Sequence, residues 1–167
     1  DMNEFSKHET KLDDYLNQGD LTFFKLTNSR ILQRVDEIDK MTKDILSKPI
    51  NLDEEDVLIL EPKNKKVPTN QTELYNEWKR YIKYNILQEM ETLNAKEETQ
   101  KMKKESVQKF KLQDTIKLNI LTPEQKYTKA KEEVGDLISD SFSRFKKVKE
   151  MDWFSRYMKA YTAVFDP

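Results

Sequence analysis

Residues that commonly build catalytic and metal sites are scarce in this chain of 167 residues. His8 is the only histidine and there is no cysteine, so one copy of the chain cannot form a Ser-His-Asp triad, a thiolate nucleophile or a multi-histidine metal site. Its two glycines stand far apart, whereas phosphate-binding loops, dinucleotide fingerprints and nucleophile elbows need clustered glycine. We therefore expect no catalytic residue, no metal ligand and no cofactor here, and we interpret His8 as a surface residue.

Serine and lysine are plentiful, and a lysine can act as the base that activates a serine nucleophile. Such a lysine must be buried so that its pKa falls, but the serines here lie in charged, helical contexts. The acidic run at residues 53–56 lacks the alternating ligands and central glycine of a calcium loop. Lysine clusters at 63–66, 101–104 and 146–147 have acidic neighbours. We interpret all of these charged stretches as solvated surface.

The overall charge argues against two classes of partner. The chain has 30 basic and 31 acidic residues, which leaves no net field to attract nucleic acid or an anionic membrane. No apolar run approaches the ~18 residues of a membrane span. We therefore expect no nucleic-acid partner and no direct membrane insertion.

The elements that would position any site are helices. Two glycines and five prolines are too few for a fold with many tight turns, and long amphipathic helices reconcile 37% charged residues with a packed core. The strongest pattern lies at residues 73–93, where apolar residues recur at steps of three, four and seven. Thr72 is the expected N-cap of this central helix. We predict that Trp78, the largest apolar side chain on its stripe, anchors the core.

Further helices are predicted at residues 2–17, 21–47, 123–149 and 153–165. Residues 94–111 are almost wholly polar, which is typical of either a solvated helix or a mobile linker, and we favour a weakly anchored helix. Gly19 is expected to end the first helix with a positive φ, and Thr122 with Gln125 forms a capping box. Asp152 is the expected cap of the last helix. Residues 49–70 read as a long excursion with one short strand at 57–60. The predicted fold is all-α, a single domain at 1–167 with about five or six amphipathic helices.

The last predicted helix has an apolar face wider than one neighbouring helix needs. One side is expected to pack on the 123–149 helix, which would leave the other side exposed as an interface. Complete burial within this domain is the alternative. The interface candidates are Trp153, Phe154, Tyr157, Tyr161 and Phe165.

Four stretches match the motifs of one known family in order and spacing. Residues 11–21 (KLDDYLNQGDL) are similar to its "klddal…GDl" turn, and residues 47–52 (SKPINL) to its "kKPfdf" helix exit. Residues 73–80 (ELYNEWKR) are similar to "eLdelWrkr", the most specific of the four. Residues 142–167 end in AVFDP, which is similar to the start of the family's "DPHTxY" junction. The chain thus resembles the N-terminal helical domain of bacterial tail-specific, or carboxy-terminal-processing, serine proteases.

The resemblance implies an exported, periplasmic protease of a Gram-negative bacterium that trims or degrades proteins from their C-termini. Its PDZ domain and serine/lysine catalytic domain would follow Pro167, and no catalytic residue is carried onto this sequence because none of the matched positions is catalytic. The implied partners are those two domains, protein substrates with nonpolar C-terminal tails and an adaptor lipoprotein. The chain begins with Asp1 rather than Met, so we expect a processed or excised piece. Residues 65–68 (KKVP) depart from the family pattern.

Two functions therefore compete. The first is a non-catalytic scaffold and substrate-handling domain of a tail-specific protease. The second is a free-standing helical module that binds another protein. The coding sequence after residue 167 discriminates between them, because only the first requires a following PDZ segment and peptidase domain.

Overall fold

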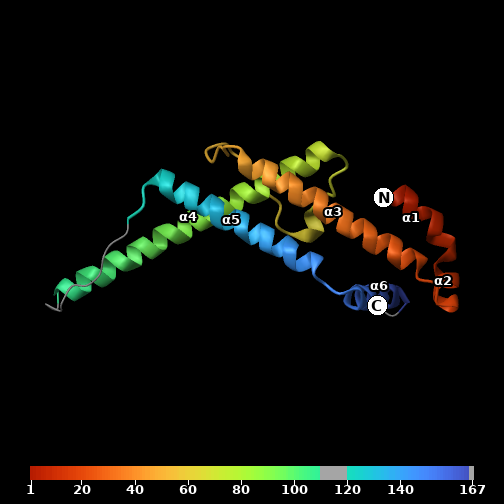
Figure 1. Ribbon diagram of the computed structural model, residues 1–167. Coiled ribbons are helices and arrows are strands. Elements are labelled where there is room, and N and C mark those ends of the chain that lie inside the picture. Colours follow the sequence, from red (N-terminus) through yellow and green to blue (C-terminus); the bar gives the residue numbers. More distant parts are fainter. Residues whose placement is uncertain (110–119, 166–167) are drawn as a thin grey trace. The chain divides into compact units, whose positions relative to one another are not determined.

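The computed structural model confirms an all-α fold for the residues it describes, which are 1–109 and 120–165, with side chains described at 1–106 and 120–163 (Figure 1). No β-strand occurs in these residues. Six α-helices and two short 3-10 helices follow one another along the chain: α1 (Met2–Phe5), a 3-10 helix (Ser6–Lys11), α2 (Leu12–Gln18), α3 (Thr22–Ser47), a 3-10 helix (Pro62–Asn64), α4 (Gln71–Lys109), α5 (Pro123–Lys146) and α6 (Glu150–Phe165).

Two helix ends have the caps that the sequence predicts. Gly19 follows α2 with φ 66°, the left-handed conformation that costs glycine little. At the start of α5, the Thr122 backbone N–H donates to Gln125 Oε1 (2.9 Å) and the Gln125 N–H donates to Thr122 Oγ1 (3.2 Å). These reciprocal bonds form the predicted capping box and satisfy donors that the first helical turn leaves free.

Three local predictions are wrong. The cap of α4 is Asn70 rather than Thr72, because the Asn70 Oδ1 accepts the backbone N–H of Glu73 at 2.9 Å. Helix α6 begins at Glu150, so Asp152 lies in its first turn and is not its cap. Residues 2–17 are not one continuous helix, since a 3-10 segment separates α1 from α2.

The chain forms two compact units, and α3 and α5 contribute to both. Unit 1 comprises Asp1–Lys40 and Asp140–Pro167, and unit 2 comprises Met41–Ser139. In unit 1 the buried apolar residues are Phe24 and Trp153. In unit 2 they are Ile45, Ile50, Ile82, Ile86, Leu93, Ala130, Val134 and Ile138. The prediction of a single domain concerns independent folding, and it stays a prediction.

The core of unit 2 lies on the predicted apolar stripe of α4, but Trp78 is not its centre. Ile82 and Ile86 are fully buried, one turn apart. Trp78 is only half-buried, with its ring edge-to-face against Tyr81 at 5.6 Å between centroids. The prediction that Trp78 anchors the core is therefore wrong: Ile82 and Ile86 are the fully buried residues of this stripe, while Trp78 lines a surface pocket with Leu74.

The excursion at 49–70 is irregular, as predicted, but its predicted strand is absent. Residues 57–60 have the composition of a strand and yet lack a hydrogen-bonded partner strand in the described part of the chain. Residues 94–109 continue α4, which confirms the predicted helix there; residues 110–111 of that prediction lie outside the described residues. Across the residues described, no helix has both the length and the apolar character that crossing a bilayer requires.

Candidate functional site

The aromatic residues of α6 pack on two sides in unit 1, against Phe145 of α5 and against Phe23 and Phe24 of α3; we call these residues the α6 cluster. Trp153 is buried, and its ring lies against Phe145 at 4.8 Å between centroids. The Arg156 guanidinium lies over the indole ring of Trp153, 4.9 Å from its centroid. A cation over an aromatic face is favourable and also covers apolar surface, so Trp153 is held on two sides.

The second side of α6 packs on α3. The Phe154 ring meets Phe24 edge-to-face at 5.3 Å, and Tyr157 lies 5.6 Å from Phe24 and 6.3 Å from Phe23. Edge-to-face and tilted pairs at these distances are stabilising beyond the apolar area that they bury. Phe24 of α3 therefore contacts both Phe154 and Tyr157 of α6.

Tyr161 ties the end of α6 to α2. Its hydroxyl donates to Asp13 Oδ1 at 2.5 Å, and this hydrogen bond to the carboxylate raises the pKa of Tyr161 to about 12. The raised pKa follows because ionising the phenol would remove the donated proton and place two negative charges side by side.

The five interface candidates thus lie in a different setting from the one expected. On the second side of α6, Phe154 and Tyr157 pack against Phe23 and Phe24 and remain half-buried, so this side is partly covered within unit 1. The side chain of Phe165 lies outside the described residues. A role for these residues in binding another domain stays a prediction, and it would use the edges of the cluster rather than an open apolar face.

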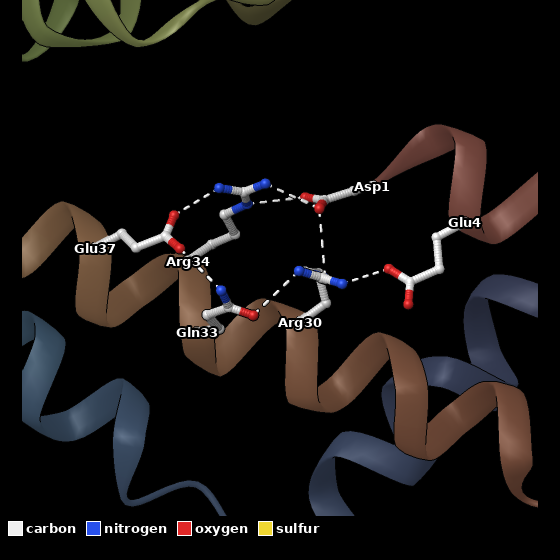
Figure 2. Close-up of polar contacts among 6 residues, drawn as sticks. All are labelled: Asp1, Glu4, Arg30, Gln33, Arg34 and Glu37. Atoms are coloured by element: carbon white, nitrogen blue, oxygen red, sulfur yellow. Dashed lines mark hydrogen bonds and ion pairs between the residues drawn. The ribbon is translucent and has the colours of Figure 1, made fainter.

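Two arginines of α3 bind the start of the chain in unit 1. Figure 2 shows Arg34 and Arg30 on successive turns with Asp1 between them. Arg34 makes two bonds to the Asp1 carboxylate, each 2.9 Å, and a third to Glu37 Oε2 at 2.5 Å. Arg30 pairs with Asp1 at 3.4 Å and with Glu4. The planar guanidinium forks make these contacts directional, so they fix where α1 begins along α3.

A buried lysine fixes the excursion to α4 in unit 2. The Lys83 side chain is 6% exposed, and its Nζ donates to the backbone carbonyl of Glu54 and to Asp56 Oδ2 at 3.0 Å. A buried ammonium is costly unless it is paired and hydrogen-bonded, and both conditions are met here. Further along, Lys65 Nζ lies 2.8 Å from Glu77 Oε1, which ties the other end of the excursion to the same helix.

Apolar side chains are exposed along this excursion. Val57 is 82% and Val67 is 83% exposed, and Leu60 is 60% exposed. Between the excursion and α4 lies a pocket of about 260 Å³. Its lining combines leucines with charged residues: Leu52, Glu54, Asp56, Leu58, Leu60, Arg80, Lys83, Tyr84 and Leu87. Such clusters of exposed apolar groups mark interaction surfaces more often than isolated ones do.

A second buried charge anchors the polar half of α4. Glu97 accepts from Lys126 Nζ (2.7 Å) through one carboxylate oxygen and from the Leu121 backbone N–H (2.8 Å) through the other. The hydrogen bond from Lys126 holds the pKa of Glu97 below its usual range, with the Leu121 bond adding to the effect. This contact joins the polar half of α4 to the start of α5.

Nearby, two carboxyl groups face each other between α4 and α5. Burial raises the pKa of Glu89, and a hydrogen bond with the Glu133 carboxyl raises it further. Two carboxylates in contact repel, so protonating one of them relieves the repulsion. In the residues that the structure describes, no group of three or more histidine, aspartate or glutamate side chains is placed to hold a metal ion.

Sequence reasoning missed Lys83, which it did not single out on the central helix, and Glu97, which it placed in a polar, weakly anchored segment. For Glu97 a signal was present: it lies four residues after Leu93, itself seven after Ile86, so it continues the buried stripe of α4. Lys83 has no comparable signal, because its burial depends on the excursion folding back over the helix.

One of three comparisons with known proteins identified a family for this chain. Searches of curated proteins and of solved structures gave no significant match. A comparison with protein-family models matched residues 1–167 to the tail-specific protease N-terminal domain. Because that match spans the whole sequence, the chain belongs to the family of tail-specific protease N-terminal domains.

Proposed function

We propose that this chain is the non-catalytic scaffold and substrate-handling domain of a tail-specific serine endopeptidase, which processes or degrades proteins from their C-termini. The observation that carries the proposal is the family match over residues 1–167. The sequence supports it, because a single histidine, no cysteine and two separated glycines leave no histidine-based triad, thiolate nucleophile or glycine-framed nucleophile elbow within one copy. The serine and lysine that perform the chemistry belong to a peptidase domain elsewhere in the polypeptide.

The internal contacts suit a scaffold. Aromatic packing joins α6 to α3 in unit 1, and a buried ion pair joins α4 to α5 in unit 2. Helices held by several independent contacts open less readily than helices held by one contact. A domain of this kind can hold other domains, or an unfolded substrate, in a defined position without taking part in bond cleavage.

The proposed partners follow from the family. They are the PDZ and protease domains of the same polypeptide, protein substrates with nonpolar C-terminal tails and an adaptor lipoprotein. The aromatic residues of α6 predicted from the sequence, Trp153, Phe154, Tyr157, Tyr161 and Phe165, are the proposed contact with the adjoining domains, and Phe154, Tyr157 and Tyr161 are the half-buried ones among those whose side chains are described. The proposed location is the periplasm, which cell fractionation of a tagged full-length product tests directly.

The test compares three proteins: the full-length gene product, the same product lacking residues 1–167, and this chain alone. Each is incubated with an unfolded substrate that carries a nonpolar C-terminal tail, and with a control whose tail is acidic. We expect the full-length protein to degrade only the nonpolar-tailed substrate and this chain alone to leave both intact. Removal of residues 1–167 should impair degradation of the protein substrate more than hydrolysis of a short peptide.

Two results would overturn the assignment. One is cleavage by this chain alone that disappears when one of its own serines is replaced by alanine. The other is a coding sequence with no PDZ or peptidase segment, which would favour a free-standing helical module that binds another protein.

A further inference from the structure

The segment at residues 55–61 has the properties of a β-strand that lacks its partner. It runs without a turn or bend between the bends at 52–54 and the 3-10 helix at Pro62–Asn64. Its centre, Val57 to Leu60, consists of apolar residues that favour strands. From Glu55 to Leu60, no backbone N–H or carbonyl bonds to another backbone group among the described residues. An unpaired row of this kind is a template for pairing with another chain.

The segment is held in place on one side and open on the other. Lys83 anchors the residues just before it through the Glu54 carbonyl and the Asp56 carboxylate. Leu58 and Leu60 line the pocket against α4, whereas Val57 and Ile59, at alternate positions, are absent from that lining and are 82% and 44% exposed. The alternation of lining and non-lining positions has the two-residue period of an extended strand, and of these four side chains only Leu58 is half-buried, since Leu60 is itself 60% exposed.

The charges that flank the segment indicate what pairs with it. On the N-terminal side Asp53 and Glu55 have no partner among the described residues, although Glu54 and Asp56 are paired with lysines of α4. On the C-terminal side Lys63 and Lys66 likewise lack a partner in the described part of the chain. The free charges are thus acidic before the strand and basic after it.

Reversing the strand places its acidic end beside the basic end of an identical strand. In an antiparallel pair of two copies, the unpaired acidic residues of each strand therefore lie beside the unpaired basic residues of the other. Glu55 and Lys63 lie four residues on either side of Ile59, so both pairs form together when Ile59 faces Ile59 across a two-fold axis. Glu55 lies in the extended segment on the side of Val57 and Ile59, and Lys63 lies in the 3-10 helix that follows it, so each charge pair joins the start of one strand to the turn after the other.

We infer that residues 55–61 pair antiparallel with the same segment of a second copy of this chain, in the register centred on Ile59. The contact is small, because seven residues from each copy bury less area than a stable standard-size interface needs. It is therefore a weak, reversible self-association that strengthens when copies are held close together. It is independent of peptidase function.

Disulfide trapping tests the register, because the chain has no cysteine of its own. An Ile59→Cys variant places the new thiols opposite each other on the axis, at the separation of directly facing strand residues. We expect it to form a disulfide-linked dimer under mild oxidation. Val67→Cys is the matched control: it is 83% exposed in the same excursion but lies outside the strand, and it should stay largely monomeric. Far-UV circular dichroism verifies that both variants keep the helical fold.

A charge exchange tests the electrostatic argument. In the Ile59→Cys background, Lys63→Glu should slow cross-linking about tenfold, because two opposite-charge pairs become like-charge pairs. Adding Glu55→Lys restores both pairs with their signs exchanged, and the rate should recover. Equal cross-linking of Ile59→Cys and Val67→Cys would show random collision and overturn the proposal. So would a Lys63→Glu effect that Glu55→Lys does not reverse, or a wild-type chain that sediments as a monomer up to millimolar concentration; the latter would leave a strand of a different protein as the occupant.

Discussion

Replacing Ile86 by alanine should destabilise the protein more than any change at Trp78, despite the larger size of tryptophan. Ile86 is fully buried in unit 2, and its truncation removes three carbon atoms. At about 0.8 kcal/mol for each buried carbon, the lost transfer free energy is about 2.4 kcal/mol. A void of roughly 40–50 Å³ left after partial relaxation adds about 1 kcal/mol at about 24 cal/mol per Å³. The expected loss in the free energy of unfolding is therefore about 3–4 kcal/mol.

Leu87 supplies a matched control on the same helix. Leucine to alanine also removes three carbon atoms, one position along α4, but Leu87 is 41% exposed. Its truncation leaves no closed void, so we expect a loss of about 1 kcal/mol or less. Trp78→Ala should fall between the two, because the half-buried indole rests on Tyr81 at the rim of a pocket.

Urea denaturation followed by far-UV circular dichroism measures these differences, and the slope of free energy on urea concentration should stay constant across the variants. Amide hydrogen exchange along α4 reports the same loss locally. The reasoning would be refuted if Ile86→Ala cost no more than Leu87→Ala. A loss at Trp78 above that at Ile86 would return Trp78 to the centre of the core.

Three further predictions concern single residues of unit 2. The hydrogen bond from Lys126 lowers the pKa of Glu97, so the ionised Glu97 stabilises the fold above the ordinary glutamate pKa, and this stabilisation is lost as pH falls through the lowered pKa. In urea titrations at several pH values, the free energy of unfolding of Glu97→Gln should therefore fall less with acid than that of the wild type. Burial and the Glu133 carboxyl raise the pKa of Glu89, so the stability that protonated Glu89 contributes is lost as pH rises through the raised pKa. Glu89→Gln should therefore increase the free energy of unfolding at pH ~7 and leave it unchanged in acid, where Glu89 is protonated. An equal effect at the two pH values would contradict the pairing of Glu89 with Glu133. Gly135→Ala should increase the free energy of unfolding by about 0.5–1 kcal/mol and so raise the thermal midpoint, because alanine favours the helix and its Cβ would lie at an ordinary contact distance of 3.6 Å from Leu46 Cδ1. A lower thermal midpoint would show that α5 requires glycine at this position.

Signals that act within a few residues could be predicted from the sequence. The capping box of Thr122 with Gln125 and the left-handed Gly19 depend on neighbours three or four positions away, and both are present. The helical period and the scarcity of glycine likewise determined the all-α class and the positions of the long helices. The order of four short motifs led to the family, which the match over residues 1–167 confirmed.

Tertiary structure decided which side chains of each stripe are buried. An amphipathic period defines a face but not its centre, and the neighbours in unit 2 cover Ile82 and Ile86 while Trp78 remains at the edge. Burial of Lys83 required a carbonyl and a carboxylate from a segment nearly thirty residues away. Burial of Glu97 required Lys126, just as distant in sequence. A charge leaves water only when a partner compensates for its lost hydration, and where that partner lies is a property of the folded chain.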